Sequence, residues 1–500
     1  MYRRTQSSPG SLLSFFVITL LCGACLFGWQ ESSAEQPGIA PSEVQSPTSQ
    51  ASFKENLPSS QSQFTDLDLQ KETKTISLRG DDERLRPDAQ FQTTIGETLL
   101  TFTGGISLDL NGQKDIDLDS KRPGDRLRAT PELAVDIIAL FPNQWYVFSE
   151  IGSFNEVSIR DGRKPMNAFF LQLNEFFLDG PLPFKIPTGI RIGRQQFFEP
   201  RRWIFDKSLD GIRFFFDPHP FHLNLSIGSP LAPVSDDETM IFNDIFQTRH
   251  RLNLLLDTTY ALTPASTLGA YALYRYDSSI IDESPVWIGI RAYGKEKLKF
   301  SKADYLKSKL KYWFDAAFVG GTVRHTNIRG FGLDVGASYI FYKYPFQPYV
   351  TIGYAFGSGD SHPTDGTDHG FRQSGLHGNT GKFGGVVNFD YYGILVDPEL
   401  SNLHIVTTGI GARPLPNTSI DLVYHRYQQH TASPQIRAYD LRPRPTGGST
   451  HIGDELDIIL GYRAIQNLRI RWRNGFFFPG SAFIQEDYAF ESRLDILYSF

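Results

Sequence analysis

The sequence predicts an all-β protein, a transmembrane antiparallel β-barrel of about 18 strands, preceded by a signal peptide and a disordered N-terminal segment. Three observations lead to this fold class. The 500 residues include 40 Phe, 22 Tyr and 44 Gly, a composition that suits alternating strands and turns. Apolar and polar residues alternate along many segments, and Gly, Pro, Asp and Asn clusters separate them. The final residues alternate toward a terminal aromatic residue, Phe500.

The first 34 residues are predicted to be a secretory signal peptide. Arg3 and Arg4 form its positive start, an apolar run follows from Leu12 to Phe27, and residues 32–34 (Ser-Ser-Ala) form a cleavage site. A lipoprotein signal that ends inside the apolar run is the alternative. The only two cysteines of the chain lie in this run, so cleavage at residue 34 leaves no thiol for a disulfide or a thiolate metal site.

Residues 35–89 are predicted to be a disordered periplasmic linker. This segment is rich in Ser, Gln, Pro, Glu and Lys and lacks periodic apolar residues, so it cannot bury enough surface to offset its ordering entropy. A partner-binding role for the segment is the alternative. The barrel is predicted over residues 90–500. No later stretch contains 18 consecutive apolar residues, so we expect no transmembrane helix in the mature chain.

The alternating segments after residue 90 are predicted to be the membrane-spanning strands. In one of them Leu456 and Ile458 share one face, and Glu455 and Asp457 share the other. This pattern separates lipid-facing from lumen-facing side chains in a closed barrel. The predicted strand cores are 95–110, 125–141, 145–156, 168–179, 188–198, 209–217, 221–229, 249–262, 266–277, 286–294, 311–324, 331–342, 348–358, 401–413, 418–428, 454–463, 467–478 and 490–500.

An even number of strands places both ends of the barrel on the periplasmic side. The longest connections, 230–248, 359–400 and 429–453, are then predicted to be extracellular loops. The terminal Phe500 resembles the signal for insertion into the outer membrane, which predicts outer-membrane lipid and the barrel-insertion machinery as partners. Because an open sheet edge is too costly in hydrocarbon, the sheet must close, and about 18 strands leave a water-filled lumen.

Arginine is concentrated on the predicted inward faces. Arg469, Arg471 and Arg473 alternate with apolar residues on one strand. We expect them to face Glu455 and Asp457 on the preceding strand and Arg493 and Asp495 on the following one. Arginine rings favour anions, and the guanidinium fork suits carboxylates. The sequence therefore predicts a positive, anion-selective lumen in which nearby carboxylates hold the arginines and keep anion binding weak; an ordinary polar lining is the alternative. Further predicted inward arginines are Arg126, Arg128, Arg213, Arg249, Arg251 and Arg291.

Other classes of function find little support in the sequence. The net charge of −6 gives no global basic field, so we expect no nucleic-acid partner. No G-x-S-x-G, P-loop or H-E-x-x-H motif is present, and we predict that the chain is not an enzyme and needs no cofactor. Loop composition accounts for the weak metal candidates Asp360, Asp365 and Asp368. The basic segment Lys295–Lys311 is interpreted as an entrance funnel for polyanions or as a solvated turn.

Four groups of motifs resemble the alginate export porin family. Residues 191–213 contain RIGRQQF, EPRRW and LDGIR, and residues 371–403 contain FRQSGLHGN, YYG and DPELSNL. Residues 413–425 contain RPL, DL and YH, and residues 453–483 contain GDELD and FPGSAF. The resemblance implies an 18-stranded outer-membrane barrel that passes an anionic uronate polysaccharide outward through an arginine-lined lumen, with periplasmic export components as possible partners.

The resemblance also assigns polymer contacts. A general anion-selective or oligosaccharide porin, and a barrel enzyme or surface adhesin, are the alternative functions. Two features depart from the family pattern. The periplasmic turn before the last two strands, 464–467, is too short to form a gate. Strict alternation would turn the Arg194 side chain toward lipid, unless Gly193 marks a bulge or Arg194 lies at the outer rim of the barrel. The assigned contacts are Arg194, Arg201, Arg202, Arg213, Arg469, Arg128 and Arg471.

Overall fold

A computed structural model describes residues 91–500 except 122–123, 232–250, 280, 299–307 and 466. All regular secondary structure in this part of the chain is β-strand, and no helix there has the length and hydrophobicity needed to span a membrane. The predicted signal peptide and the predicted linker lie outside the described residues and stay predictions.

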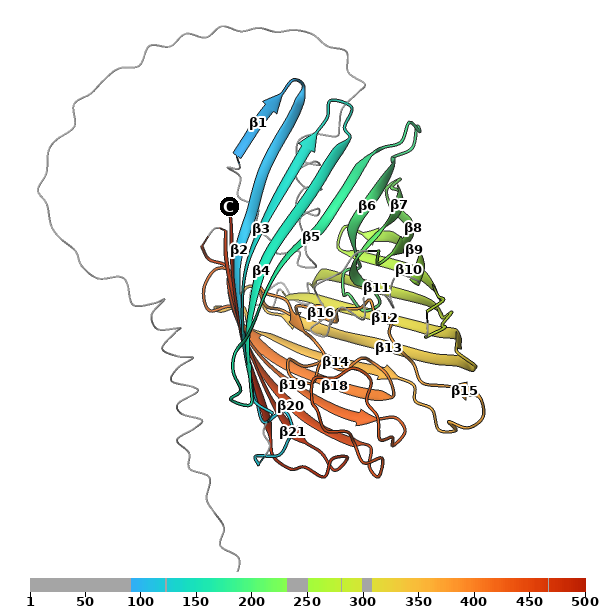
Figure 1. Ribbon diagram of the computed structural model, residues 1–500, viewed down its shortest axis with the longest axis vertical. Coiled ribbons are helices and arrows are strands. Elements are labelled where there is room, and N and C mark those ends of the chain that lie inside the picture. Colours follow the sequence, from blue (N-terminus) through green and yellow to red (C-terminus); the bar gives the residue numbers. More distant parts are fainter. Residues whose placement is uncertain (1–90, 122–123, 232–250, 280, 299–307, 466) are drawn as a thin grey trace, which may run out of the picture. The chain divides into compact units, whose positions relative to one another are not determined.

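Eighteen antiparallel strands of the described residues form a closed barrel, which confirms the predicted fold class (Figure 1). Each strand pairs with the next one along the barrel, and the last pairs with the first from Gly105↔Ser499 to Lys114↔Phe490. This pairing removes the free edges that hydrocarbon would not tolerate. The strands are β2 (Thr98–Lys114), β3 (Arg126–Leu140), β4 (Tyr146–Arg160), β5 (Met166–Pro181), β6 (Thr188–Phe198), β7 (Asp206–Phe216), β8 (Phe221–Ser229), β9 (Arg251–Thr263), β10 (Ser266–Asp277), β11 (Val286–Leu298), β12 (Ser308–Val323), β13 (Thr326–Ile340), β14 (Tyr349–Gly357), β18 (Leu403–Ala412), β19 (Thr418–Gln429), β20 (His451–Tyr462), β21 (Leu468–Pro479) and β22 (Ala489–Ser499).

Four short strands accompany the barrel. β1 (Phe91–Ile95) pairs with residues 98–102 of β2. The same edge of β2 pairs with β22 over residues 105–114. β15 (Thr367–Asp368) runs parallel to β13, and β16 (Thr380–Gly381) pairs with β17 (Phe389–Asp390). The last three lie within the connection between β14 and β18, so this connection carries structure of its own.

The outer surface of the barrel is apolar in the way that the alternation predicts. Along β19, Ile420, Leu422 and Tyr424 are exposed, whereas Asp421 and Val423 between them are buried. The same alternation exposes Ile288 and Ile290 on β11 and Val350 and Ile352 on β14. A closed sheet with this apolar belt is built for lipid on its outside, which places the barrel in the outer membrane.

The lengths of the connections orient the barrel. Short turns such as 264–265 and 413–417 join strands at the end where β2 begins and β22 ends. The long connections 358–402 and 430–450 lie at the opposite end. Because periplasmic turns are short and extracellular loops are long in such barrels, the first is the periplasmic end and the second the outer end.

The C-terminal residue takes part in closing the barrel. The backbone N–H and C=O of Phe500 exchange hydrogen bonds of 3.0 Å with Gly104, and the Thr103 hydroxyl donates to the Phe500 carbonyl at 2.7 Å. These contacts extend the β2–β22 ladder by one residue at the periplasmic end. The terminal residue is therefore part of the seam that makes the sheet continuous.

Deleting Phe500 should lower the free energy of unfolding by roughly 2–3 kcal/mol, because three hydrogen bonds of the seam are lost. The measurement is urea unfolding of the barrel in lipid vesicles. Ile484→Ala is the control, since Ile484 is 79% exposed in the outer connection 480–488 and should change the free energy little. An unchanged free energy after the deletion would show that the seam does not depend on its last residue.

Candidate functional site

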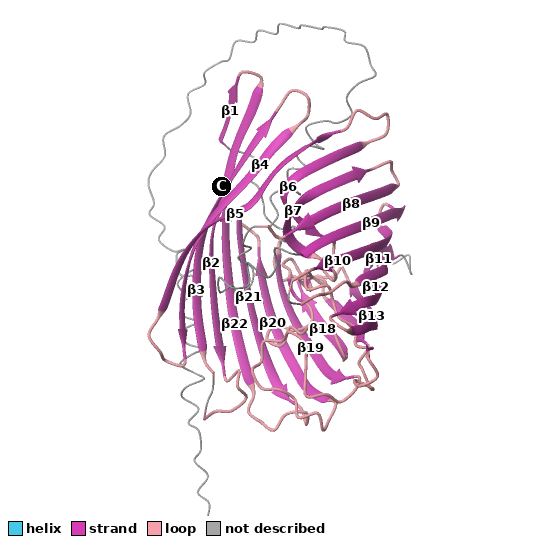
Figure 2. Cartoon of the chain, turned by 45° about the vertical axis from the view of Figure 1, so that its right-hand side comes forward, coloured by secondary structure: helices cyan, strands magenta, loops and turns pink. Residues whose placement is uncertain are grey.

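The connection 358–402, here named the inner loop, folds into the lumen, where Figure 1 labels its strand β16. Figure 2 draws loop segments of the chain in pink between the barrel strands. Its aromatic residues Phe371 and Phe389 are fully buried, and they belong to one core cluster with wall residues such as Trp287 and Trp313. The prediction of an extracellular loop over 359–400 is therefore wrong for most of the segment. The inner loop carries many apolar side chains, and their exposure to water is unfavourable. The wide interior of the barrel provides apolar wall surface against which they pack.

One carboxylate of β20, Glu455, and one tyrosine of β19, Tyr427, hold the middle of the inner loop. Glu455 is completely buried and accepts hydrogen bonds from the backbone N–H groups of Leu395 (2.7 Å) and Val396 (3.2 Å). The hydroxyl of Tyr427 donates to Glu455 at 2.8 Å. Asp457 lies one inward position farther along β20, 3.3 Å from the ring of His425. In this structure Glu455 binds the loop of the same chain.

The connection 199–205 also enters the lumen and reaches the opposite wall. Arg201 forms ion pairs with Asp315 of β12 (3.1 Å) and Asp334 of β13 (2.5 Å). Its guanidinium also lies 4.7 Å from the ring centre of Trp313 and 4.4 Å from that of Tyr391. Two carboxylates and two aromatic faces thus hold one cation, a combination that favours the charged guanidinium despite its burial.

The connection 199–205 and the inner loop pack on each other. Trp203 stacks on Phe371 with ring centres 5.8 Å apart, and its Nε1–H donates to the hydroxyl of Tyr392 at 2.8 Å. That hydroxyl donates in turn to Asp334 at 2.9 Å. Arg202 donates to the Thr380 hydroxyl at 2.9 Å and lies 3.4 Å from Asp206. The two segments therefore form a single body that is bonded to several walls of the barrel.

The arginines of β21 face the lumen as predicted, and two of them pair with Asp495 on the following strand as predicted, whereas Glu455 and Asp457 on the preceding strand lie elsewhere. Arg471 forms two 3.1 Å bonds with Asp495 of β22 and donates to the backbone carbonyl of Asn388 at 2.9 Å. Arg473 pairs with Asp390 of the inner loop at 2.5 Å and with Asp495 at 3.2 Å. The register explains this difference, because Glu455 and Asp457 lie opposite Phe477 and Gly475, farther toward the outer end.

Arg194 occupies the end of a strand pairing rather than a bulge. The β5–β6 and β6–β7 registers continue through Gly193 without a shift, and the β5–β6 pairing ends at Phe176↔Arg194. The Arg194 side chain donates to the Asn174 carbonyl at 3.2 Å and pairs with Asp210 at 3.3 Å. With only 5% of its surface exposed, Arg194 is buried on the wall, which corrects the bulge explanation.

The remaining predicted arginines are distributed over several walls. Arg213 lies over the ring of Phe197 at 4.2 Å and donates to the Gln196 carbonyl at 2.8 Å. Arg251 pairs with Asp277 at 3.0 Å. Arg128 is buried on β3, and Arg469 lies nearest the periplasmic end of β21. Arg249 lies outside the described residues.

Sequence reasoning missed the acidic partners on β12 and β13. Asp315 and Asp334 are direct register partners, and both interrupt apolar stretches at inward positions. A carboxylate at an inward position within an apolar stretch is the pattern that could have identified them. The same pattern led to the prediction that Asp457 faces the lumen. Carboxylates thus pair with several lumenal arginines, among them Arg201, Arg251 and Arg473. The predicted positive field of the lumen stays a prediction.

A basic surface lines the periplasmic end of β11 and β12. Lys295 pairs in register with Lys311, and Lys297 with Lys309, on the same strand faces as the buried Arg291 and Trp313. These four lysines therefore point to the lumen side, as the funnel interpretation requires. The middle of the predicted basic segment, 299–307, lies outside the described residues.

The weak metal candidates act as turn residues. Asp360, Asp365 and Asp368 each accept the backbone N–H of the residue two positions later, at 3.1, 2.8 and 2.8 Å. Asp368 also pairs with Arg372. Among the described residues no group of three or more His, Cys, Asp or Glu side chains is arranged to hold a metal ion.

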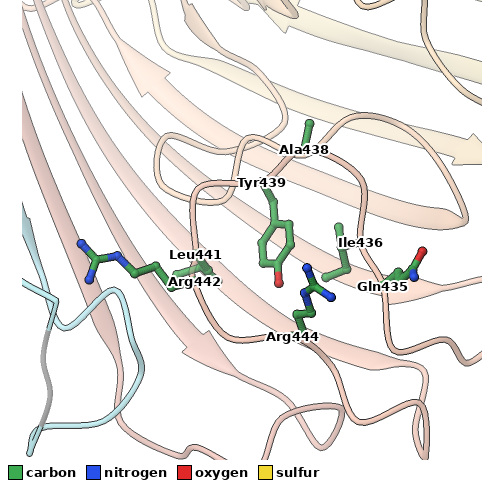
Figure 3. Close-up of a pocket in the computed structure, with 7 residues that line it drawn as sticks. All are labelled: Gln435, Ile436, Ala438, Tyr439, Leu441, Arg442 and Arg444. Atoms are coloured by element: carbon green, nitrogen blue, oxygen red, sulfur yellow. The ribbon is translucent and has the colours of Figure 1, made fainter. Parts of the chain in front are cut away.

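A recess of about 400 Å³ opens in the outer connection 430–450 (Figure 3). Ion pairs join this connection to its surroundings: Arg437 pairs with Glu399 of the inner loop at 3.2 Å, and Arg442 pairs with Asp117 at 3.3 Å. The recess thus combines an aromatic ring with basic side chains at the outer end of the barrel. Its lining residues are Gln435, Ile436, Ala438, Tyr439, Leu441, Arg442 and Arg444.

A closed barrel with a lipid-facing belt and a charged lumen defines the class of outer-membrane channels. The chain belongs to the alginate export family, whose model matches residues 145–494. It is 26% identical over 156 residues to the alginate production protein AlgE of Azotobacter vinelandii, a match that covers 26% of this chain and 32% of that relative. The chain therefore aligns with about a third of the length of this curated relative.

Solved structures confirm the fold. OccK11 (OpdR) of Pseudomonas aeruginosa superposes with a TM-score of 0.50 at 14% identity, covering 82% of this chain and 99% of that one. The outer membrane protein opdK of the same organism gives a TM-score of 0.51 at 10% identity, covering 80% and 98%. These similarities support the barrel architecture alone.

Replacing Arg201 by Ala should lower the free energy of unfolding by about 3–5 kcal/mol, because Asp315 and Asp334 lose the cation that compensates their burial. Urea unfolding in vesicles measures the change. Arg442→Ala is the matched control: this exposed ion pair with Asp117 should contribute about 0–1 kcal/mol. Equal effects of the two substitutions would contradict the assigned role of Arg201.

The inner loop should respond to pH through His377. Burial, together with the nearby Lys207, Arg275 and Arg437, lowers the pKa of His377 from 6.5 to about 3. Protonation therefore favours the released loop as the pH falls below about 6.5. Amide hydrogen exchange of residues 371–379, compared at matched pH, should be faster in the wild type than in His377→Gln below pH 6.5 and equal above it. A difference that does not change with pH would refute this linkage.

Proposed function

We propose that this chain is a channel that passes an anionic exopolysaccharide, an alginate-like polyuronate, outward through a lumen lined by arginine and lysine. One observation supports the proposal most directly. Inward cations follow one another from the periplasmic end to the middle of the barrel, including Lys295, Lys311, Arg471 and Arg473. A polymer with one carboxylate on each sugar meets such donors repeatedly along its path.

Paired arginines suit transport better than bare ones. Arg471 and Arg473 share the carboxylate of Asp495, and Arg473 also pairs with Asp390. These partners fix the guanidinium groups and reduce their attraction for a passing carboxylate. A passing anion then gains enough from the exchange to enter but is not held, which is the condition for conduction.

The position of the lysines favours export over uptake. Lys295, Lys297, Lys309 and Lys311 lie at the periplasmic end, where an exported polyanion enters the barrel. A basic surface at that end raises the local concentration of the polymer. A general anion-selective or oligosaccharide porin is the second candidate, because lumenal cations also attract small anions.

The selectivity of the lumen can be tested by charge reversal. Planar-bilayer recordings of the wild type should give a reversal potential that indicates anion preference. Arg469→Glu combined with Arg471→Glu should abolish or invert that preference, because both substitutions replace lumenal cations. Arg426→Glu is the control. The Arg426 side chain is 54% exposed and lies on the face of β19 that points away from the lumen, so this substitution should leave the reversal potential unchanged.

The substrate class is tested by current block in the same recordings. Mannuronate oligomers should block the current at lower concentration than maltodextrins of equal length, because only the former carry carboxylates. Cation preference in the wild type, or equal block by charged and neutral glycans, would refute the proposal.

A further inference from the structure

The tip of the inner loop, residues 382–390, presents oxygen atoms to several lumenal cations. The guanidinium group of Arg413 donates to the carbonyl oxygens of Gly384 (2.6 and 2.9 Å) and Gly385 (3.1 Å). Lys311 donates to the carbonyl of Lys382. The oxygen acceptors of the loop thus occupy cationic donors at the periplasmic end of the barrel, where a polymer from the periplasm arrives.

The same tip continues this pattern along β21. The Asn388 carbonyl accepts from Arg471 at 2.9 Å, and the Asp390 carboxylate pairs with Arg473. Four cations from three separate places in the barrel wall therefore contact oxygens of one nine-residue segment, and one of these oxygens belongs to a carboxylate. A short stretch of loop reproduces the row of acceptors that a uronate chain carries.

An aromatic contact completes the likeness to a sugar chain. Phe383 stacks on Trp313 with ring centres 5.6 Å apart and an angle of 8° between the ring planes. Phe383 lies between Lys382 and Gly384 in the sequence, so the stacked ring sits between the Lys311 and Arg413 contacts. A flat apolar face flanked by oxygen acceptors is also how a pyranose ring with its carboxylate and hydroxyl groups presents itself to an indole and its basic neighbours.

We propose that residues 382–390 occupy a uronate-binding site formed by Lys311, Trp313, Arg413 and Arg471, and that polymer carboxylates entering from the periplasm displace them. This inference rests on the proposed function. Three of the four cations bind neutral carbonyl oxygens in the present state. Because a carboxylate forms stronger charge-assisted hydrogen bonds than a carbonyl, the polymer gains free energy from the exchange. The loop tip is then a competitor that the correct cargo removes.

The barrel itself keeps its bonds in such an exchange. The tip is joined to the wall by side-chain contacts and by the hydrogen bond from the Val386 N–H to the Ser419 hydroxyl (3.0 Å). Its own strand pair, β16–β17, lies within the inner loop. Departure of the tip therefore breaks no pairing between the strands of the barrel, and the Val386 amide reports directly on whether the tip is seated.

The first test is amide hydrogen exchange of the wild-type barrel with saturating mannuronate oligomers or with maltodextrin. The oligouronate should accelerate exchange at Val386 severalfold, while the neutral glycan should leave it unchanged. Current block by the oligouronate without faster exchange at Val386 would overturn the inference and leave the proposed function intact. Absence of current block would instead overturn the proposed function.

The second test weakens the competitor. Phe383→Ala removes the ring that stacks on Trp313 and leaves every strand residue unchanged. The oligouronate concentration that halves the current should fall by roughly tenfold, the effect expected from losing a stacked aromatic anchor. Phe331→Ala, on the lipid-facing side of β13 and 45% exposed, is the control and should have no effect. An unchanged half-blocking concentration in Phe383→Ala would contradict competition between loop and polymer.

Discussion

The structure depends on one constraint: backbone N–H and C=O groups that cross hydrocarbon must all be hydrogen-bonded within the protein. A sheet meets this constraint only when its first and last strands pair, as β2 and β22 do here with the help of Phe500. Closure then forces successive side chains to alternate between lipid and lumen. The apolar belt and the charged interior are two consequences of the same pairing.

Closure by this many strands creates an interior that the wall residues alone do not fill. The inner loop and the connection 199–205 enter it, and their aromatic residues form a core with Trp287 and Trp313 inside the barrel. Charged groups in such a place need partners, and Arg201 has Asp315 and Asp334. The interior therefore resembles the core of a soluble protein threaded by ion pairs more than a simple aqueous pore.

Membership of the alginate export family and the placement of the cations both support the proposed transport of a polyanion. Basic residues at the periplasmic end and along β21 contact oxygens of the loop tip, including the carboxylate of Asp390. Under the proposed function, the segment that fills the lumen carries the same kind of oxygen acceptors as the cargo. Under the proposed displacement, the covalent attachment of that segment keeps it close to the site that it leaves.

The sequence alone determined the strands, because lipid outside and polar groups inside impose a period of two on every strand: each of the 18 predicted cores overlaps an observed strand, and Arg471 and Arg473 face inward as expected. Only the tertiary structure decided the course of the inner loop and the partners of the arginines. Arg201 and Asp334 are separated by 133 positions, and Arg473 and Asp390 by 83. Such contacts depend on the width and register of the closed sheet, which no local pattern of residues encodes.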